Sequence, residues 1–330
     1  DHGRHDNLVT LPVCAAGRDC QPGIPTRSFT GFALQCRFVP PRGIRLSNDP
    51  IHPALARLLL VLGLLLGAAS ATAAAADASM PAHLTLRIPS KVLAETRVVN
   101  VYVPPGYDGK AQTRYPVLYM LDGGENEDFP HLVDTLDGLI RAGGIPPMLL
   151  VGIENTERRR DMTGPTTVES DRQIAPLVGG SATFRQFLAE ELLPQIRAIY
   201  NVNDEAAMIG ESLAGLFVIE TLFVQNDLFD TYIAIDPSLW WNAEQWWREA
   251  GTRLGGAVAI HARLFLASAG DSGGASAHFA DALCRSPLAD LRWTYTHHAK
   301  LRHASIYRKL EKGLLTEAFS GQAMSATACD

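Results

Sequence analysis

The sequence has no tract in which lysines and arginines cluster, and its formal net charge is −6, from 29 Lys and Arg against 35 Asp and Glu. Proteins bind phosphate backbones through clustered positive charge, so this balance argues against a nucleic-acid partner. The glycine pairs that begin at residues 143, 179, 255 and 273 match no phosphate-binding pattern. Internal repeats are also absent.

Cysteine is scarce. Of five cysteines, three (Cys14, Cys20 and Cys36) lie near the start of the chain, and only Cys284 and Cys329 follow residue 76. Two cysteines in about 250 residues do not make a disulfide scaffold, so we expect Cys284 to be a small core residue of a helix near 278–283.

Metal-ligand patterns are missing as well. His297, His298 and His303 crowd one segment, but no carboxylate or cysteine at ligand spacing accompanies them. The sequence therefore predicts no metal site, and it gives no sign of a cofactor.

The chain is otherwise ordinary globular material, with 47% hydrophobic and 19% charged residues. Residues 1–53 show no sustained periodicity and are rich in Pro, Arg and Gly. We expect them to be disordered or to lie upstream of the true translation start. A small disulfide module is the alternative, although three cysteines would leave one unpaired.

Residues 54–76 have the pattern of a secretory signal peptide. Arg57 precedes the apolar run Leu58–Leu66, and the small-residue run 67–76 offers Ala-x-Ala cleavage sites. We expect export with cleavage and no stable membrane association afterwards. The alternative is an uncleaved membrane anchor, because the low-polarity stretch approaches the roughly 20 residues that span a bilayer. Residues 77–330 would then form one catalytic domain.

Buried strands and helical segments alternate through that domain. The strands are predicted near 84–88, 98–103, 116–121, 148–153, 206–209, 232–235, 263–268 and 291–296, and helices near 129–142, 184–196, 216–223 and 306–314. This alternation, after an opening pair of strands, predicts an α/β fold: a mostly parallel sheet with helices on both faces.

One strand ends in Gly210-Glu211-Ser212-Leu213-Ala214-Gly215 and is followed by an apolar helix. Small residues around a serine at a strand-to-helix turn are typical of a nucleophile elbow. A loop serine that caps the helix is the alternative reading of the motif alone.

The loops after three strands present Ser212, Asp271 and His303, in that order along the chain. Functional residues of α/β sheets collect beyond the carboxyl ends of the strands, and Ser…Asp…His is the order of the α/β-hydrolase triad. We predict Ser212 as nucleophile, His303 as general base and Asp271 as the acid that orients it. Backbone N–H groups of Leu213, Gly123 and Gly124 are the predicted oxyanion donors.

The chain from about residue 84 onwards resembles the esterase family that contains enterochelin (siderophore) esterases and esterase D-type S-formylglutathione hydrolases. The resemblance is carried by segments 115–123, 145–153, 155–161, 210–217 and 236–241, and by the histidine before the last helix. It implies the α/β-hydrolase fold, hydrolysis of small-molecule carboxylic esters and, from the exported bacterial members, a periplasmic location.

Two departures from that family matter, and the first is Glu211, which stands where histidine often precedes the nucleophile. Some siderophore esterases work with a Ser–His dyad, so a site without the Asp271 carboxylate is the alternative to the triad. Acyl transfer, peptide hydrolysis and a non-catalytic binding protein are the alternative functions.

Three further residues are candidates for a substrate pocket. Trp240 and Trp241 follow a strand end, where they could wall the acyl pocket or simply pack in the core. Arg160 could bind an anionic substrate, although an internal ion pair with Asp161 is the reading we favour. The sequence itself does not specify the acyl or alcohol group.

Overall fold

The protein is described by a computed structural model that covers residues 80–110, 112–250, 259–285, 290–324 and 329. All of these belong to one compact unit, Ala74–Asp330. The segment expected to be disordered, 1–53, and the expected signal peptide, 54–76, lie outside the described residues.

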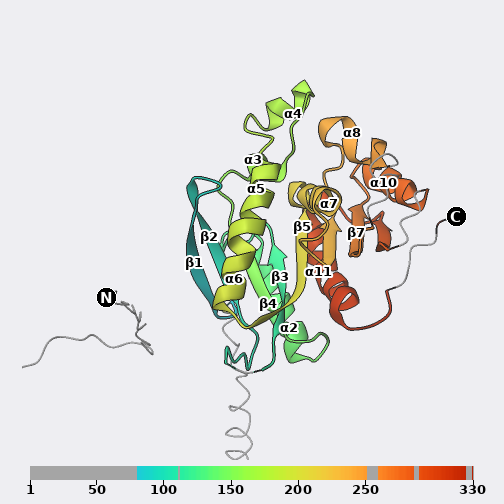
Figure 1. Ribbon diagram of the computed structural model, residues 1–330. Coiled ribbons are helices and arrows are strands. Elements are labelled where there is room, and N and C mark those ends of the chain that lie inside the picture. Colours follow the sequence, from blue (N-terminus) through green and yellow to red (C-terminus); the bar gives the residue numbers. More distant parts are fainter. Residues whose placement is uncertain (1–79, 111, 251–258, 286–289, 325–328, 330) are drawn as a thin grey trace, which may run out of the picture. The chain divides into compact units, whose positions relative to one another are not determined.

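The unit is built on one eight-stranded sheet, whose strands follow the order β1-β2-β4-β3-β5-β6-β7-β8 (Figure 1). Their bounds are β1 His83–Ser90, β2 Glu95–Tyr102, β3 Tyr115–Met120, β4 Leu149–Ile153, β5 Val202–Glu211, β6 Thr231–Ile235, β7 Arg263–Ala269 and β8 Arg292–His298. The pairs β1–β2 and β2–β4 are antiparallel, and all other neighbours are parallel. The predicted fold class, a mostly parallel α/β-hydrolase sheet, is confirmed.

The central strands are buried on both faces, as parallel strands between helix layers require. Successive residues of β3 enter opposite cores: Val117 and Tyr119 lie in one hydrophobic cluster, and Leu118 and Met120 in the other. This explains why the sequence shows a continuous apolar run here instead of an alternating pattern.

Helices cover both faces (Figure 1). One face packs against α5 (Ser181–Phe187), α6 (Leu193–Ile199), α7 (Leu213–Val224), α8 (Trp241–Arg248) and α10 (Ala275–Cys284). The other face packs against α2 (Phe129–Arg141) and α11 (His303–Phe319). The short helices α3 (Arg158–Met162) and α4 (Glu169–Ile174) belong to the connection between β4 and α5.

The helix predicted through Phe184 and Ile196 is interrupted. A π-helical turn, η1 (Leu188–Leu192), joins α5 to α6, and Pro194 lies in the first turn of α6. Proline has no N–H to donate to the carbonyl four residues earlier, and a wider turn accommodates that loss. The apolar face nevertheless stays continuous, because Leu188 and Leu192 are fully buried.

The loops beyond the carboxyl ends of the strands carry α4 and α8, which lie at the upper end of the unit in Figure 1. Within α8, residues Asn242, Ala243 and Glu244 have left-handed backbone angles, with φ between 49° and 63°. Side chains of the α4 region hold this turn: Asp171 accepts a hydrogen bond from the Asn242 N–H at 2.8 Å.

The prediction that Cys284 is simply a small core residue is wrong. Cys284 forms a disulfide with Cys329, and the two cysteines are 45 positions apart in the sequence. The correction could not come from spacing, because nothing in the sequence indicates that the end of α10 meets a residue beyond α11.

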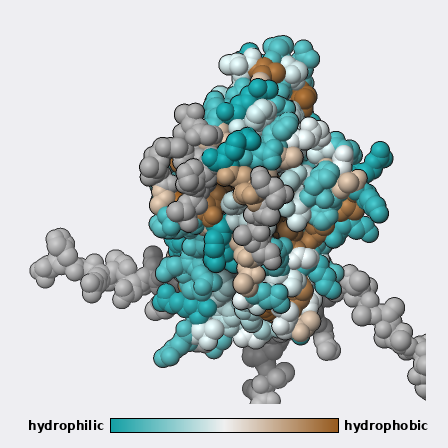
Figure 2. Space-filling model, turned by 90° about the vertical axis from the view of Figure 1, so that its right-hand side faces the viewer, coloured by the Kyte–Doolittle hydropathy of each residue, from teal (hydrophilic) through white to brown (hydrophobic). Residues whose placement is uncertain are grey.

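Large exposed apolar side chains are scattered over the described surface, on Leu84, Ile174, Leu177, Ile199, Val224 and Trp240. On the face shown in Figure 2, outside the area that grey atoms cover, hydrophobic residues form small groups separated by hydrophilic ones. In the part of the chain that the structure describes, no helix combines the length and apolar character needed to cross a membrane.

Candidate active site

Ser212 lies at the sharp turn between β5 and α7, as predicted. Its backbone has φ 62° and ψ −121°, a conformation that few non-glycine residues adopt. A side chain at Gly210 would place Cβ about 2.7 Å from the backbone of Ala214, and one at Gly215 about 3.1 Å from Pro237. The turn therefore requires glycine at position 210. At position 215 a side chain would be tightly confined by Pro237, whereas the alanine at position 214 is accommodated.

His303 connects the serine to a carboxylate. Its Nε2 lies 3.0 Å from the Ser212 Oγ, and its Nδ1 lies 2.6 Å from Oδ2 of Asp236. When Nδ1 carries the proton and donates it to the carboxylate, Nε2 presents a lone pair to the serine hydroxyl. This is the arrangement that a general base requires.

The carboxylate is Asp236, at the end of β6, and not Asp271. Asp236 is 2% exposed, and its carboxylate also accepts hydrogen bonds from the Ser272 hydroxyl at 2.7 Å and the Ala269 N–H at 2.9 Å. Burial pushes its pKa up, but these hydrogen bonds and the one from His303 outweigh burial, so the pKa of Asp236 lies below its ordinary value. A buried, ionised acid is thus held on the imidazole.

Asp271 lies one strand further along the sheet. Its Oδ1 accepts a hydrogen bond from the backbone N–H of His303 at 2.8 Å, so it contacts the base through the main chain and not through the ring. The predicted Ser…Asp…His order is retained, but the Asp that reaches the imidazole belongs to a different loop.

The order of strands explains the error. Both Asp236 and Asp271 follow buried strands, and both lie between Ser212 and His303 in the chain. Because β6 pairs directly with β5 and β7 does not, the loop after β6 lies nearer to the nucleophile turn than the loop after β7. The segment Asp236-Pro237-Ser238 is part of the family resemblance, and this was the one feature of the sequence that could have indicated Asp236 as the acid.

Two further groups surround the reacting atoms. The Ser238 hydroxyl lies 3.3 Å from the Ser212 Oγ. Glu211, immediately before the serine, places Oε1 at 3.9 Å from the His303 Nδ1. The hydrogen bond to Asp236 raises the pKa of His303 above its ordinary value, against the opposing effect of burial, and the Glu211 charge adds to the increase.

The predicted oxyanion donors differ in their availability. Leu213 is the first residue of α7, and the first N–H groups of a helix have no intrahelical partner. The Gly123 N–H, however, donates to the Ile153 carbonyl at 2.9 Å, and the Gly124 N–H donates to the Glu127 carboxylate at 2.8 Å. Both glycine donors are occupied in this structure, and the close approach of β4 explains the requirement for glycine at 123.

Arg158 ties the loop after β3 to the nucleophile turn. It binds the Asp122 carboxylate through Nε at 2.6 Å and through a terminal nitrogen at 2.7 Å, and it reaches the Glu211 carbonyl at 3.4 Å. Burial opposes its charge, but the bonds to Asp122 outweigh burial and raise the pKa of Arg158. Its guanidinium is therefore engaged within the protein.

The pocket candidates separate into buried and exposed residues. The Arg160 Nε binds Asp161 at 2.7 Å and a terminal nitrogen binds Glu95 at 3.0 Å, so the internal ion pair is present. Trp241 is 2% exposed and donates its indole N–H to the Gly164 carbonyl, which is a packing role. Trp240 is 42% exposed, and of the two tryptophans it is the one available to a ligand.

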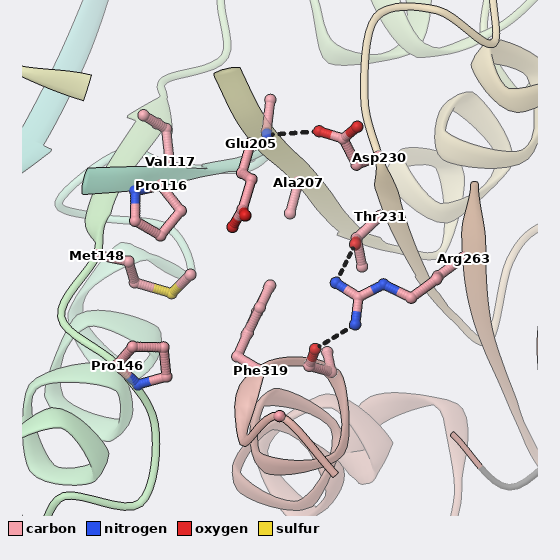
Figure 3. Close-up of a pocket in the computed structure, with 13 residues that line it drawn as sticks. Pro116, Val117, Pro146, Met148, Glu205, Ala207, Asp230, Thr231, Arg263 and Phe319 are labelled. Carbon is pink, nitrogen blue, oxygen red and sulfur yellow. Dashed lines mark hydrogen bonds between the residues drawn. The ribbon is translucent and has the colours of Figure 1, made fainter. Parts of the chain in front are cut away.

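A cavity of about 380 Å³ lies elsewhere, at the amino-terminal ends of the parallel strands (Figure 3). Pro116, Pro146, Met148 and Phe319 line it, and Arg263 is held at its edge by hydrogen bonds to Thr231 and the Ala318 carbonyl. It contains none of the predicted site residues.

Comparison with known proteins gives a family match. The model of the family named Esterase, described as "Putative esterase", matches residues 90–285. The chain is 33% identical to the ferri-bacillibactin esterase BesA of Bacillus subtilis over 164 residues, which is 45% of this chain and 56% of the relative. It is 30% identical to the siderophore triacetylfusarinine C esterase of Aspergillus fumigatus over 167 residues, 45% of this chain and 53% of the relative.

The chain thus spans about half the length of these two curated relatives. Among solved structures, an IroE-like serine hydrolase from Shewanella oneidensis superimposes with a TM-score of 0.67 at 26% identity, covering 74% of this chain and 82% of that one. The match to residues 90–285, together with the strand order described above, shows that the chain belongs to this esterase family of α/β-hydrolases.

Proposed function

We propose that the protein is a serine carboxylic-ester hydrolase with Ser212 as nucleophile, His303 as general base and Asp236 as the acid. The observation that carries the proposal is the position of the His303 ring, with one nitrogen 3.0 Å from the serine hydroxyl and the other 2.6 Å from a buried carboxylate. Asp236 takes the role that the sequence had assigned to Asp271.

The reaction follows from the geometry. The His303 Nε2 accepts the hydroxyl proton as the Ser212 Oγ attacks the ester carbonyl, and Asp236 stabilises the imidazolium that results. The Leu213 N–H, at the positive end of α7, binds the oxygen on which negative charge develops. The imidazolium then protonates the leaving alcohol, and the same base activates the water that hydrolyses the acyl-enzyme.

For the substrate, we propose an ester of the siderophore class. The support is family likeness: the curated relatives carry the names of siderophore esterases. No cofactor takes part in this chemistry.

We also propose that the protein is exported and works in the periplasm. The run 54–76 supports export, and so does the Cys284–Cys329 disulfide, because such bonds persist in oxidising compartments. The intact mass of the protein recovered outside the cytoplasm tests this, and retention of Leu58–Leu66 would contradict cleavage.

Labelling with a fluorophosphonate tests the nucleophile. We expect one covalent adduct on Ser212, located by peptide mass mapping, and no adduct in Ser212→Ala or His303→Ala. Ser238→Ala is the matched control, because this second serine lies beside the nucleophile and should not be the modified residue. An adduct elsewhere, or none in the wild-type protein, would reject the proposal.

The substrate is tested with p-nitrophenyl esters of increasing acyl length alongside a ferric siderophore ester. We expect the siderophore ester to give the higher kcat/KM. A clear preference for a simple short acyl ester would reject the siderophore class while leaving the esterase intact. Product analysis with added alcohol or amine acceptors distinguishes hydrolysis from acyl transfer.

A further inference from the structure

Three carboxylates surround His303, and each approaches it differently. Asp236 binds Nδ1 at 2.6 Å, Asp271 accepts the hydrogen bond of the backbone N–H at 2.8 Å, and Glu211 lies 3.9 Å from Nδ1. Asp236 has a role as the acid of the proposed triad. Asp271 has a role in holding the main chain at His303. Glu211 has no role in the mechanism derived above.

Glu211 is the last residue of β5, and its side chain is 17% exposed. In the described part of the chain its carboxylate receives no hydrogen bond, and the His303 ring is its partner within ion-pair distance. An ionised carboxylate that is largely removed from water and accepts no hydrogen bond costs free energy of folding, unless a nearby cation compensates its charge.

The other charged groups that face Glu211 come from three elements. Arg158 of α3 is attracted to it, but that guanidinium is already bound to Asp122. Asp122, after β3, and Asp128, before α2, both repel it. Burial is the largest effect and, offset in part by His303, it raises the pKa of Glu211 to about 7. The cation that Glu211 can best compensate is the one that forms on His303 during the reaction.

We propose that Glu211 is a positioning residue that acts through His303. In its ionised form it supplies a second negative charge beside Nδ1, next to Asp236, and stabilises the imidazolium formed when Ser212 attacks. No new bond is made or broken: the proton moves from the Ser212 Oγ to Nε2 as in the triad mechanism. The inference rests on the proposed nucleophile and base, and it adds a residue to them.

The test measures the rate of Ser212 modification by a fluorophosphonate as a function of pH, because this readout does not depend on the natural substrate. Glu211→Gln removes the charge with little change of shape, and Glu205→Gln, an exposed residue of the same strand, is the matched control for losing one negative charge. Glu211→Asp keeps the charge. Thermal unfolding confirms that each variant is folded.

In Glu211→Gln we expect the rate of modification on the alkaline plateau to fall by up to about tenfold. The acidic limb of the profile, which follows the ionisation of His303, should move down by about one pH unit, since one pKa unit corresponds to a factor of ten. The rates of the variant and the wild type should therefore converge at low pH. Glu205→Gln should give the wild-type profile, and Glu211→Asp should keep the limb near its wild-type position.

A loss of the same factor at every pH in Glu211→Gln, with an unmoved limb, would overturn the inference and assign Glu211 a structural role. An unchanged rate and limb would also overturn it. If the wild-type Ser212 is not modified at all, the failure belongs to the proposed nucleophile and not to Glu211.

Discussion

Asp236 has a left-handed backbone, with φ 45°, immediately before Pro237. Its carboxylate is oriented by donors from three places in the chain: the His303 ring, the Ser272 hydroxyl and the Ala269 N–H. Such a carboxylate cannot change its direction without leaving hydrogen-bond donors unpaired in a buried site. Its bond to Nδ1 therefore orients the His303 imidazole, whose other ring nitrogen lies 3.0 Å from the Ser212 Oγ.

Asp236→Asn and Asp271→Asn therefore differ in effect. Removing the acid that holds Nδ1 should lower kcat by about 10³–10⁴-fold, because the asparagine favours the wrong imidazole tautomer. Asp271→Asn removes the charge but keeps a side-chain oxygen that can accept the His303 backbone N–H, so it should cost less than about tenfold, the scale of one hydrogen bond. Steady-state kinetics with one p-nitrophenyl ester checks both, and the reverse ranking would restore Asp271 as the acid.

At the residue scale, the motif around Ser212 and the position of His303 after the last strand were enough to predict two of the three interacting side chains. The third was ambiguous, because two aspartates follow buried strands in the permitted interval. Only the strand order and the direction of each side chain distinguish them. Likewise, Trp240 and Trp241 are adjacent in sequence, yet one is exposed and the other buried.

At the scale of elements, α2 and α11 pack together on one face of the sheet, and α11 begins with His303. A polar cluster joins the two helices. His131 of α2 contacts Glu311 of α11 and, at 3.1 Å, Asp128, while Thr135 donates to Glu311. Tyr307 lies against the His131 ring with centroids 5.0 Å apart. The cluster thus ties α11, the helix that begins with His303, to α2.

Burial alone would lower the pKa of His131, but its bonds to Asp128 and Glu311 outweigh burial and raise the pKa to about 9. Because the folded-state pKa is above the ordinary value of about 6.5, the stabilisation is fully present below that pH and is lost as pH rises through about 9. His131→Gln should lower Tm by about 2–4 °C near pH 6, with a smaller difference at higher pH.

Scanning calorimetry at several pH values measures this effect. The control is His261→Gln, whose side chain is 79% exposed and which should leave the Tm unchanged throughout. A destabilisation of the same size at every pH would contradict a charged His131.

The positions of strands and helices were predictable because their apolar runs are long and are separated by clear turns. The sequence predicted the fold class, a mostly parallel sheet with helices on both faces. It did not predict the order of the strands or which helix covers which face, because no local pattern encodes which strands become neighbours. The π turn at Leu188–Leu192 and the left-handed turn at Asn242–Glu244 depend on packing and on distant contacts such as Asp171, so sequence periodicity does not show them.

At the scale of the whole unit, the Cys284–Cys329 disulfide links the end of α10 to a residue beyond α11. Cross-linking a loop of this length should stabilise the folded state by about 2–4 kcal/mol, largely by restricting the unfolded chain. We expect Cys329→Ser and Cys284→Ser to lose the same free energy of unfolding, and a reductant to lower the wild-type value to theirs. Urea unfolding of oxidised and reduced protein measures it, and equal stability of the two forms would refute the expectation.

The same disulfide makes a covalent ring of the segment that contains β8, α11 and His303. A single proteolytic cut within that ring, for example at the exposed Lys300, leaves both fragments attached to each other. Gel electrophoresis of the nicked protein would show one band without reductant and two with it. The ring therefore means that one cleavage does not by itself release the polypeptide that carries His303.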